Sequence, residues 1–282
     1  MDFGKVKILL IIVFLGLNVF LARQWLVLGS SVSIYTEPFS DQLANIQRTF
    51  AEHGINMDAQ LPGNPSTLPM TMVSMSPAWF TNAAELSISE SKKTASGHPL
   101  QVHTSLGSAV WVSPDQVRVM FDRNQAVVVM RQGERLDGLH KWLLRHVYNF
   151  NDYQLLFTHL SHRTGVVKYV ETVNNLGIYS APLVVVIEHG KIIRMMQTYV
   201  VIGKSIYPRT VMSAANALLA LASNMDKAQL EIDNTIKNMQ LGYSSPISTS
   251  STGYLSPVWR IASTRGFFYV NALNGEVSVQ NQ

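Results

Sequence analysis

The 282-residue chain contains no cysteine, which excludes disulfide bonds, thiolate metal ligands, cysteine nucleophiles and a lipid-modified amino-terminal cysteine. Charged residues are also scarce, at 14% of the chain, so extended disorder and strongly acidic or basic tails are excluded. The net charge is only +4, whereas a nucleic-acid-binding domain normally carries a dense basic face. The length allows one large domain or two small domains with a proper core.

Sequence motifs of catalytic and metal sites are missing as well. There is no GxSxG nucleophile elbow, and none of the eight histidines has HExxH spacing. His159 and His162 lie three residues apart, but on a strand their side chains would point to opposite faces. Gly203-Lys204-Ser205 has the ending of a phosphate-binding loop, yet Thr198 stands where such a loop needs glycine, so we predict a turn between strand and helix. We therefore expect no catalytic, cofactor-binding or metal-binding residues and no small-molecule substrate.

One long apolar run is present, at the amino terminus. Residues Ile8–Ala22 carry no charge, and the run resumes at Trp25–Leu28. A helix over Val6–Leu28 would be about 34 Å long, which is enough to cross the hydrocarbon core of a bilayer. Lys5 and Lys7 precede the run, so the amino terminus is expected to stay cytoplasmic and everything after Leu28 to be exported. No second stretch is apolar over the length that a membrane span needs.

The competing interpretation of this run is a cleaved signal peptide, but Phe20-Leu21-Ala22 is a poor cleavage site, so we predict an uncleaved anchor. Gly16 and Asn18 lie near the middle of the span and are candidate contacts with partner helices. Glycine lets two helix backbones approach closely, and an amide in hydrocarbon could bond a neighbouring helix for ~1 kcal/mol. The alternative for Asn18 is that it bonds its own helix backbone or lies near the interface.

The rest of the chain alternates helical and strand patterns, which predicts an α+β fold. Helices are expected at residues 40–53, 134–148 and 210–222, and a loop at 61–69. In the second helix, Leu136, Leu139, Leu143 and Val147 share one face. Strands are expected at residues 117–121, 126–130, 153–159, 166–173, 183–188, 191–201, 236–243, 257–262, 266–271 and 276–279. The first two strands are predicted to form a hairpin with each other, as are those at 183–188 and 191–201.

The order hairpin, helix, strands occurs twice, at residues 117–173 and 183–279. It predicts two α+β modules, each with an antiparallel sheet covered by one helix. Both internal duplication and chance explain the repeat, since many α+β domains have this order. The expected domains are the cytoplasmic tail and anchor at 1–28 and two exported modules at 29–175 and 176–282. Residues 55–115 carry no pattern that indicates a function.

The closing segment contains a motif that predicts folding rather than catalysis. Trp259 and Tyr269 alternate with polar residues, which suits facing positions on a hairpin. Leu273-Asn274-Gly275 is expected to form the next turn, and Asn271 can bond the backbone of its own turn. The structural motif comprises Pro257, Trp259, Arg260, Tyr269, Asn271 and Gly275.

Both ends of the chain resemble the YycI family. At the amino terminus the resemblance lies in Met1-Asp2-Phe3-Gly4-Lys5-Val6-Lys7 and the apolar run that follows. At the carboxyl end it lies in Leu241-Gly242-Tyr243, in Leu255-Ser256-Pro257-Val258-Trp259-Arg260-Ile261, in Phe268-Tyr269-Val270-Asn271-Ala272 and in Asn274-Gly275-Glu276. These stretches cover about a quarter of the chain, and the pattern at the carboxyl end is shared loosely with YycH and with PepSY-type domains.

The resemblance implies a non-enzymatic accessory regulator of the WalK (YycG) sensor histidine kinase, which controls cell-wall metabolism in low-GC Gram-positive bacteria. It implies a single-pass protein of the cell membrane whose partners, the kinase and a YycH-like protein, are contacted through the transmembrane helix. No cofactor is implied. The alternative is an extracytoplasmic binding or inhibitor module of PepSY type that the anchor only tethers. A wall hydrolase is a weak third reading because no catalytic set is present.

Overall fold

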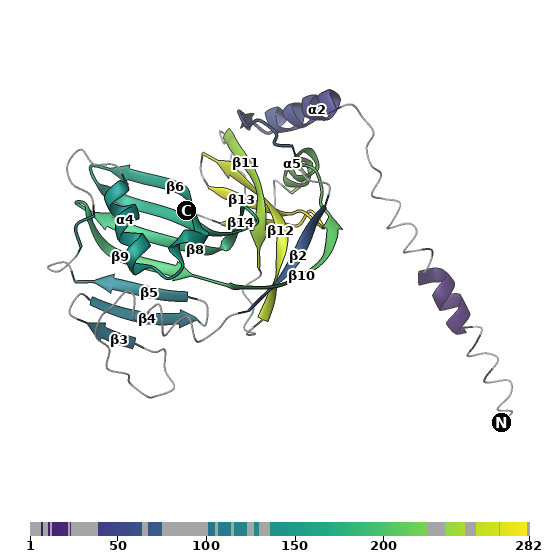
Figure 1. Cartoon of the computed structure of the whole chain (residues 1–282). Helices are drawn as coiled ribbons and strands as arrows, with labels where there is room; N and C mark the ends of the chain where they lie inside the picture. The colour runs from purple at the N-terminus through teal and green to yellow at the C-terminus, as the bar shows by residue number, and fades with distance from the viewer. Residues whose placement is uncertain are drawn as a thin grey trace. The chain divides into compact units, whose positions relative to one another are not determined.

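The computed structural model describes residues 7, 11, 13–21, 23, 39–63, 67–74, 101–104, 107–113, 116–122, 127–129, 136–224, 235–245, 252–264 and 266–280. They form an α+β fold dominated by strands, with few helices (Figure 1), and this confirms the predicted fold class. The chain divides into two compact units, Met1–Asn45 and Ile46–Gln282. All the strands belong to the second unit.

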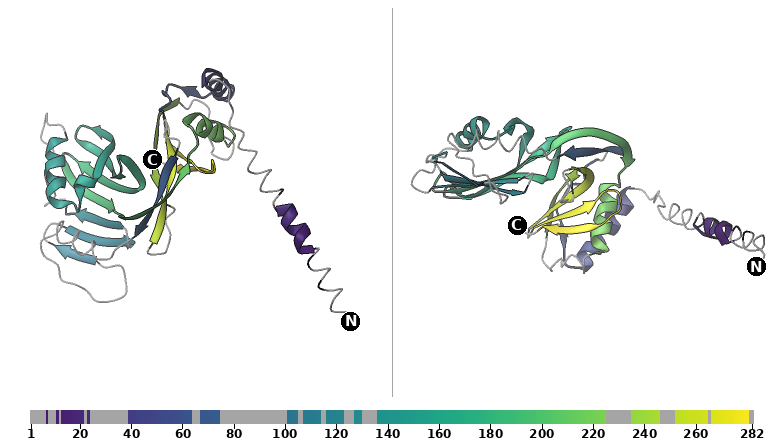
Figure 2. Two further views of the ribbon diagram at one scale, coloured as in Figure 1. Left: turned by 45° about the vertical axis from the view of Figure 1, so that its right-hand side comes forward. Right: turned by 90° about the horizontal axis from the view of Figure 1, so that it is seen from below.

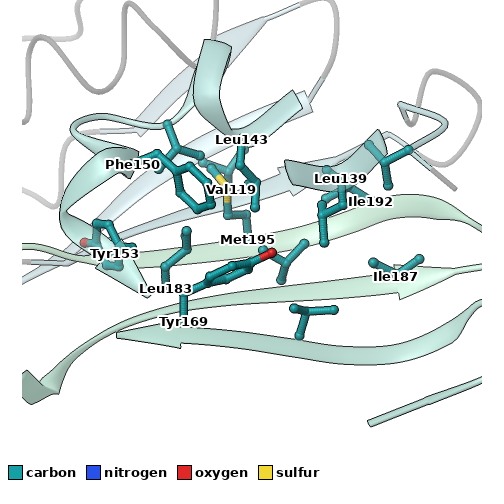
Figure 3. Packing of buried hydrophobic residues seen from close by; sticks show 14 of the residues in the cluster. Val119, Leu139, Leu143, Phe150, Tyr153, Tyr169, Leu183, Ile187, Ile192 and Met195 are labelled. Atoms are coloured by element: carbon teal, nitrogen blue, oxygen red, sulfur yellow. The ribbon is translucent and has the colours of Figure 1, made fainter. Parts of the chain in front are cut away.

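Seven antiparallel strands form one part of the sheet. In spatial order they are β3 (Gln101–Thr104), β4 (Gly107–Ser113), β5 (Gln116–Phe121), β9 (Lys191–Thr198), β8 (Leu176–Glu188), β7 (Thr164–Val173) and β6 (Tyr153–Ser161). Helix α4 (Asp137–His146) lies over one face of these strands, followed by the short 3-10 helix η1 (Phe150–Asp152). Leu139 and Leu143 of α4 are fully buried, and they pack with Leu183 and Met195 of the sheet in one core (Figure 3).

A second group of strands joins the chain end to segments before β3. In spatial order they are β1 (Asn56–Met57), β11 (Thr235–Ser244), β12 (Thr252–Ser263), β13 (Phe267–Asn271) and β14 (Val277–Gln280). The start of β12 also pairs with β2 (Thr67–Ser74), and β2 pairs in turn with β10 (Val201–Thr210). Helix α5 (Ala214–Ala222) lies beside the yellow carboxyl-terminal strands (Figure 2). Ile46 and Phe50 of α2 (Phe39–Glu52) are buried in the same core. Two helices therefore pack against this sheet, whereas one was predicted.

The two groups of strands meet where β8 and β11 pair in parallel, through Ile178 and Tyr243. Gly242 permits the approach, because a Cβ there would lie 2.5 Å from the carbonyl oxygen of Gly177 and 2.6 Å from the ring of Tyr179. β1 and β11 are parallel as well. The sheet is therefore mixed, and the prediction of wholly antiparallel sheets is wrong at these two places.

The helices and most strands lie where the sequence predicts them. One correction concerns the strand predicted at 126–130, of which the structure describes residues 127–129. These residues are not paired with β5: β5 pairs with β4 and β9, and Val128 forms an isolated bridge with Lys191. Val119 of β5 instead lies opposite Met195 of β9, inside the core under α4. On its second side, β5 therefore pairs with a strand that shares its core and not with the segment that follows it in sequence.

Two further corrections concern segments predicted as loop or turn. Thr67–Pro69, within the predicted loop at 61–69, belongs to β2, where Pro69 lies opposite Pro208 beside a register shift of β10. Proline is tolerated at such irregularities and on edge strands, because no regular ladder bond is lost there. Gly203-Lys204-Ser205 lies inside β10 and is no turn. Thr210 ends that strand, and α5 begins only after Ser213, whose hydroxyl accepts the backbone N–H of Asn216.

Strand pairing groups the chain differently from the division expected at residues 175 and 176. That boundary falls in the tight turn between β7 and β8, two strands paired along most of their length. Residues 101–198 supply the seven-stranded part, whereas residues 46–74 and 201–280, on either side of it in the sequence, supply the other strands. The polar stretch at residues 83–98 lies outside the described residues.

Candidate functional site

The amino-terminal segment is helical at residues 13–21 and carries large apolar side chains on every side. Val13, Phe14, Leu15, Leu17, Val19, Phe20 and Leu21 are each 50–63% exposed. Successive helical residues are rotated by about 100°, so these seven positions surround the helix axis. Within the described part of the chain, no helix combines the length and the apolar character needed to cross a membrane.

Gly16 and Asn18, the predicted helix contacts, both lie on this segment. The side-chain amide of Asn18 donates a hydrogen bond of 3.0 Å to the carbonyl oxygen of Phe14, one turn earlier. This bond is the local alternative considered for Asn18, and it uses one of the two N–H groups of the amide. A Cβ added at Gly16 would have no atom within 4 Å, so packing inside the described chain gives no reason for glycine there.

The closing motif is built into the core of the second group of strands. Trp259 is fully buried, and its Nε1 donates to the carbonyl oxygen of Met212 over 3.0 Å. Asn271 Oδ1 accepts the backbone N–H of Leu273, as predicted for a residue that bonds its own turn. Gly275 has φ +76° and donates its N–H to the carbonyl oxygen of Asn271, which explains a glycine at the end of this turn. These contacts hold the strands together, consistent with a folding motif.

Pro257, Arg260 and Tyr269 complete the motif. Pro257 lies opposite Tyr243 of β11, and its carbonyl oxygen accepts the N–H of Ala272. Arg260 and Tyr269 are paired across β12 and β13 and are both buried. Burial raises the pKa of the Tyr269 hydroxyl, and the positive charge of Arg260 partly offsets that rise. Arg260 is thus an interior cation, which a sequence pattern alone does not reveal.

A second polar cluster lies where β9 continues into β10. The carboxylate of Glu171, only 1% exposed on β7, accepts the backbone N–H of Val200 over 2.9 Å. The hydroxyl of Tyr153 donates to the carbonyl oxygen of Thr198, two residues earlier. Burial raises the pKa of Glu171 from 4.5 to about 8, against the bond from Val200, which lowers it. Glu171 and Tyr153, which are paired across β6 and β7, thereby both bond the backbone of the connection between the two groups of strands.

Tyr199, which is also buried, makes further hydrogen bonds at the same connection. Its hydroxyl donates to Oδ2 of Asp152 and accepts from the amide of Asn149, both over 2.9 Å. Gln197 Nε2 donates to the carbonyl oxygen of Tyr148 over 2.8 Å. Sequence analysis missed this cluster. The available signal was Glu171 itself, a carboxylate between the apolar residues Val170 and Val173 of the predicted strand.

The two histidines of the HxxH pattern, His159 and His162, form no metal site with other described residues. His159 is exposed on β6, and His162 lies in the following turn with φ +49°. In the part of the chain that the structure describes, no group of three or more His, Cys, Asp or Glu side chains could hold a metal ion. The strand conformation of Gly203-Lys204-Ser205 also differs from a loop that wraps its backbone around a phosphate.

Comparison with known proteins gives one family. A family model described as "YycI protein" matches residues 37–273. No curated protein matches the chain. Among solved structures, an uncharacterized protein from Eubacterium rectale ATCC 33656 is similar, at 8% identity and a TM-score of 0.54, covering 85% of this chain and 99% of the other. This likeness shows a shared fold only.

Two further solved structures match with lower TM-scores. The C-terminal domain of YpeB from Bacillus megaterium is 14% identical with a TM-score of 0.38, covering 74% of this chain and 99% of that one. YycH from Bacillus subtilis is 14% identical with a TM-score of 0.48, covering 78% of this chain and 53% of that one.

Proposed function

Because the chain belongs to the YycI family, we propose that it is a membrane-anchored accessory regulator of the WalK (YycG) sensor histidine kinase, with no catalytic activity of its own. The match over residues 37–273 is the observation that carries this proposal, since it spans most of the chain. Family membership supports a regulatory role in a two-component system and an association with the kinase and YycH. The control of cell-wall metabolism in a Gram-positive cell is part of the same proposal.

The amino-terminal helix is the proposed anchor. A helix that is apolar on every side is typical of a segment covered by lipid or by other helices, because each Å² of apolar surface in water costs about 25 cal/mol. The exposed side chains at residues 13–21 and the uncharged run Ile8–Ala22 support this placement. With Lys5 and Lys7 before the run, the amino terminus would face the cytoplasm and residues 29–282 would be extracellular.

The proposed mode of action is contact between this helix and partner helices of the kinase and a YycH-like protein. Gly16 supports it, because its open surroundings leave room for the backbone of a second helix. Asn18 supports it in a more limited way. Its bond to Phe14 satisfies one N–H, so the second N–H and the carbonyl oxygen are the groups available to a partner.

The test is recovery of the kinase and the YycH-like protein with the affinity-tagged full chain from solubilised membranes. Asn18→Leu should keep membrane insertion and lower recovery several-fold, which corresponds to ~1 kcal/mol of lost helix contact. Leu17→Ile, an apolar exchange at the neighbouring position, is the matched control and should leave recovery unchanged. If the kinase and the YycH-like protein were recovered equally with Asn18→Leu and with the wild type, Asn18 would serve only the hydrogen bond within its own helix.

A second variant separates the anchor from the exported part. The entire apolar run is exchanged for an unrelated membrane helix of equal length, at equal membrane levels. Loss of kinase recovery supports the proposed helix contact. Full recovery would move the regulatory contact to residues 29–282 and favour the PepSY-like binding or inhibitor module over the proposal.

A further inference from the structure

The face of the seven-stranded part that points away from α4 carries a basic and apolar surface. Side chains alternate between the two faces of a strand. Val119 of β5 packs in the core under α4, so its neighbours Arg118 and Met120 lie on the opposite face. Both are exposed, Met120 by 44%. The helices α2 and α5 pack in the other core, beside the carboxyl-terminal strands (Figure 2).

The neighbouring strand β9 continues this surface with the same two residue types. Arg118 lies opposite Met196, and Met120 lies opposite Arg194. Arg194 is exposed and Met196 is partly exposed. Diagonal neighbours on adjacent strands are about 7–8 Å apart, so the two arginines project from one small area with a methionine beside each. We call these four residues the Arg–Met face.

The positions around the Arg–Met face add apolar surface and no negative charge. Those directly opposite its members on the outer strands are Ser108 and Val110 of β4 and Val184 and Val186 of β8. All four are partly exposed. Neither Arg118 nor Arg194 has an ion-pair partner among the residues that the structure describes. The Arg–Met face therefore presents two uncompensated cations on an apolar background.

The two arginines decide which kind of surface fits this face. A second copy of the chain would bring arginine against arginine, and like charges at an interface oppose association. A neutral apolar partner would remove both guanidinium groups from water without supplying a counter-charge. An anionic lipid surface offers phosphate groups at its boundary and apolar chains just below them, which suits arginines and methionines side by side.

We propose that the Arg–Met face docks onto an anionic phospholipid surface, the bilayer that holds the chain's own anchor. The proposal rests on the proposed anchor, because the ten residues at 29–38, between the predicted span and α2, reach at most about 35 Å. This tether keeps the exported part close to the bilayer, at a high effective concentration. Arg118 and Arg194 bind lipid phosphates, and Met120 enters the headgroup region.

The absence of cysteine makes a direct test possible in the full chain, since one introduced cysteine can carry a fluorophore at a chosen position. Ser108→Cys reports from the strand beside the Arg–Met face. Leu144→Cys reports from the exposed side of α4, on the other side of the sheet. Each labelled chain is reconstituted into vesicles of phosphatidylcholine, or of an equal mixture with phosphatidylglycerol, that contain a lipid with a quenching nitroxide on its headgroup.

The label at Ser108→Cys should be quenched in the mixed vesicles and much less in phosphatidylcholine alone, and the label at Leu144→Cys in neither. Replacing Arg118 and Arg194 together by glutamine should lower the docking equilibrium about thirtyfold, about fivefold for each arginine near an anionic surface. Replacing both by lysine keeps the charge and should keep the quenching. Lys204→Gln with Arg209→Gln removes two exposed charges of β10 and is the matched control, which should dock as the wild type does.

Three results would overturn the proposal. The first is quenching at Ser108→Cys that is equal in the two lipid compositions, since charge would then have no part in it. The second is equal quenching of the two labels in the mixed vesicles, which would mean that neither face is preferred. The third is equal docking by the wild type and the double glutamine variant at Arg118 and Arg194, which would place the lipid contact elsewhere on the protein.

Flotation of the same samples separates this proposal from the proposed anchor. A chain that floats with both vesicle types but shows no quenching at Ser108→Cys keeps its anchor and overturns the docking alone, which would leave the Arg–Met face to an acidic protein surface. A chain that floats only with the mixed vesicles, with that label quenched, supports the docking and overturns the anchor. A chain that floats with neither overturns both.

Discussion

Replacing the buried carboxylate of Glu171 with an amide should make the stability of the protein much less dependent on pH. The pKa of Glu171 is raised from 4.5 to about 8 in the folded state, because its side chain is 1% exposed. Between these two values the folded protein holds a proton that the unfolded chain releases. The contribution of Glu171 to the free energy of unfolding should therefore be fully present below pH 4.5 and fall as the pH rises toward 8, by about 1.4 kcal/mol per pH unit.

Glu171→Gln keeps the size of the side chain and an oxygen that can accept the N–H of Val200, but it cannot ionise. Between about pH 5.5 and about pH 7.5, the wild type should lose about 2–3 kcal/mol of stability through this residue, and the variant should lose none of it. Urea unfolding of the full chain in neutral detergent, followed by tryptophan fluorescence, measures both proteins at each pH. The quantity to compare is the difference in the free energy of unfolding between wild type and variant, followed as a function of pH.

Glu276→Gln is the matched control for this experiment. Glu276 is exposed, and its backbone carbonyl, which accepts the N–H of Asn271, is unchanged by the substitution. Its pH profile should run parallel to that of the wild type. Parallel profiles for Glu171→Gln and the wild type would refute the reasoning, since they would show that Glu171 ionises in the folded protein as it does in water.

Two further predictions concern the core and the topology. Trp259→Ala should lower the free energy of unfolding by about 3–5 kcal/mol, because it empties a fully buried site and leaves the carbonyl oxygen of Met212 without its donor; an unchanged unfolding midpoint would contradict this. A reporter that is active only in the cytoplasm, fused after Gln282, should be silent in intact cells, because Lys5 and Lys7 are expected to hold the amino terminus inside. Activity of that fusion would reverse the proposed topology.

Local patterns in the sequence were sufficient for the helices and for the strands from β5 to β9 and from β11 to β14, but not for β1 to β4 or β10. Helix α4 could be predicted because Leu139 and Leu143 recur at helical spacing, and both are buried in the structure. The turn at Asn274-Gly275 could be predicted because a glycine with positive φ and an asparagine bonding its own turn are both local requirements. The resemblance to the YycI family rested on short stretches at the two ends of the chain, and the family match confirms it.

Which strands become neighbours was decided by the tertiary structure. β5 has an alternating apolar face, but that face does not specify whether residues 126–130 or β9 should pair with it. The choice depends on the shared core beneath α4, to which Val119 and Met195 both belong. In the same way, β1 and β2 join strands more than a hundred residues away, because their apolar side chains complete a core with α5 and Trp259.

Some of the candidate sites could likewise be found from the sequence, and others only from the tertiary structure. Gly16 and Asn18 were visible in the sequence, because a glycine and an amide interrupt an apolar run, and their role as helix contacts stays a prediction. In the sequence, Glu171 and Arg260 are ordinary charged residues of strands. The fold places the backbone N–H of Val200 against Glu171 and the ring of Phe267 against Arg260. Burial and neighbouring charge set the pKa of a carboxylate, and both depend on segments that only folding brings together.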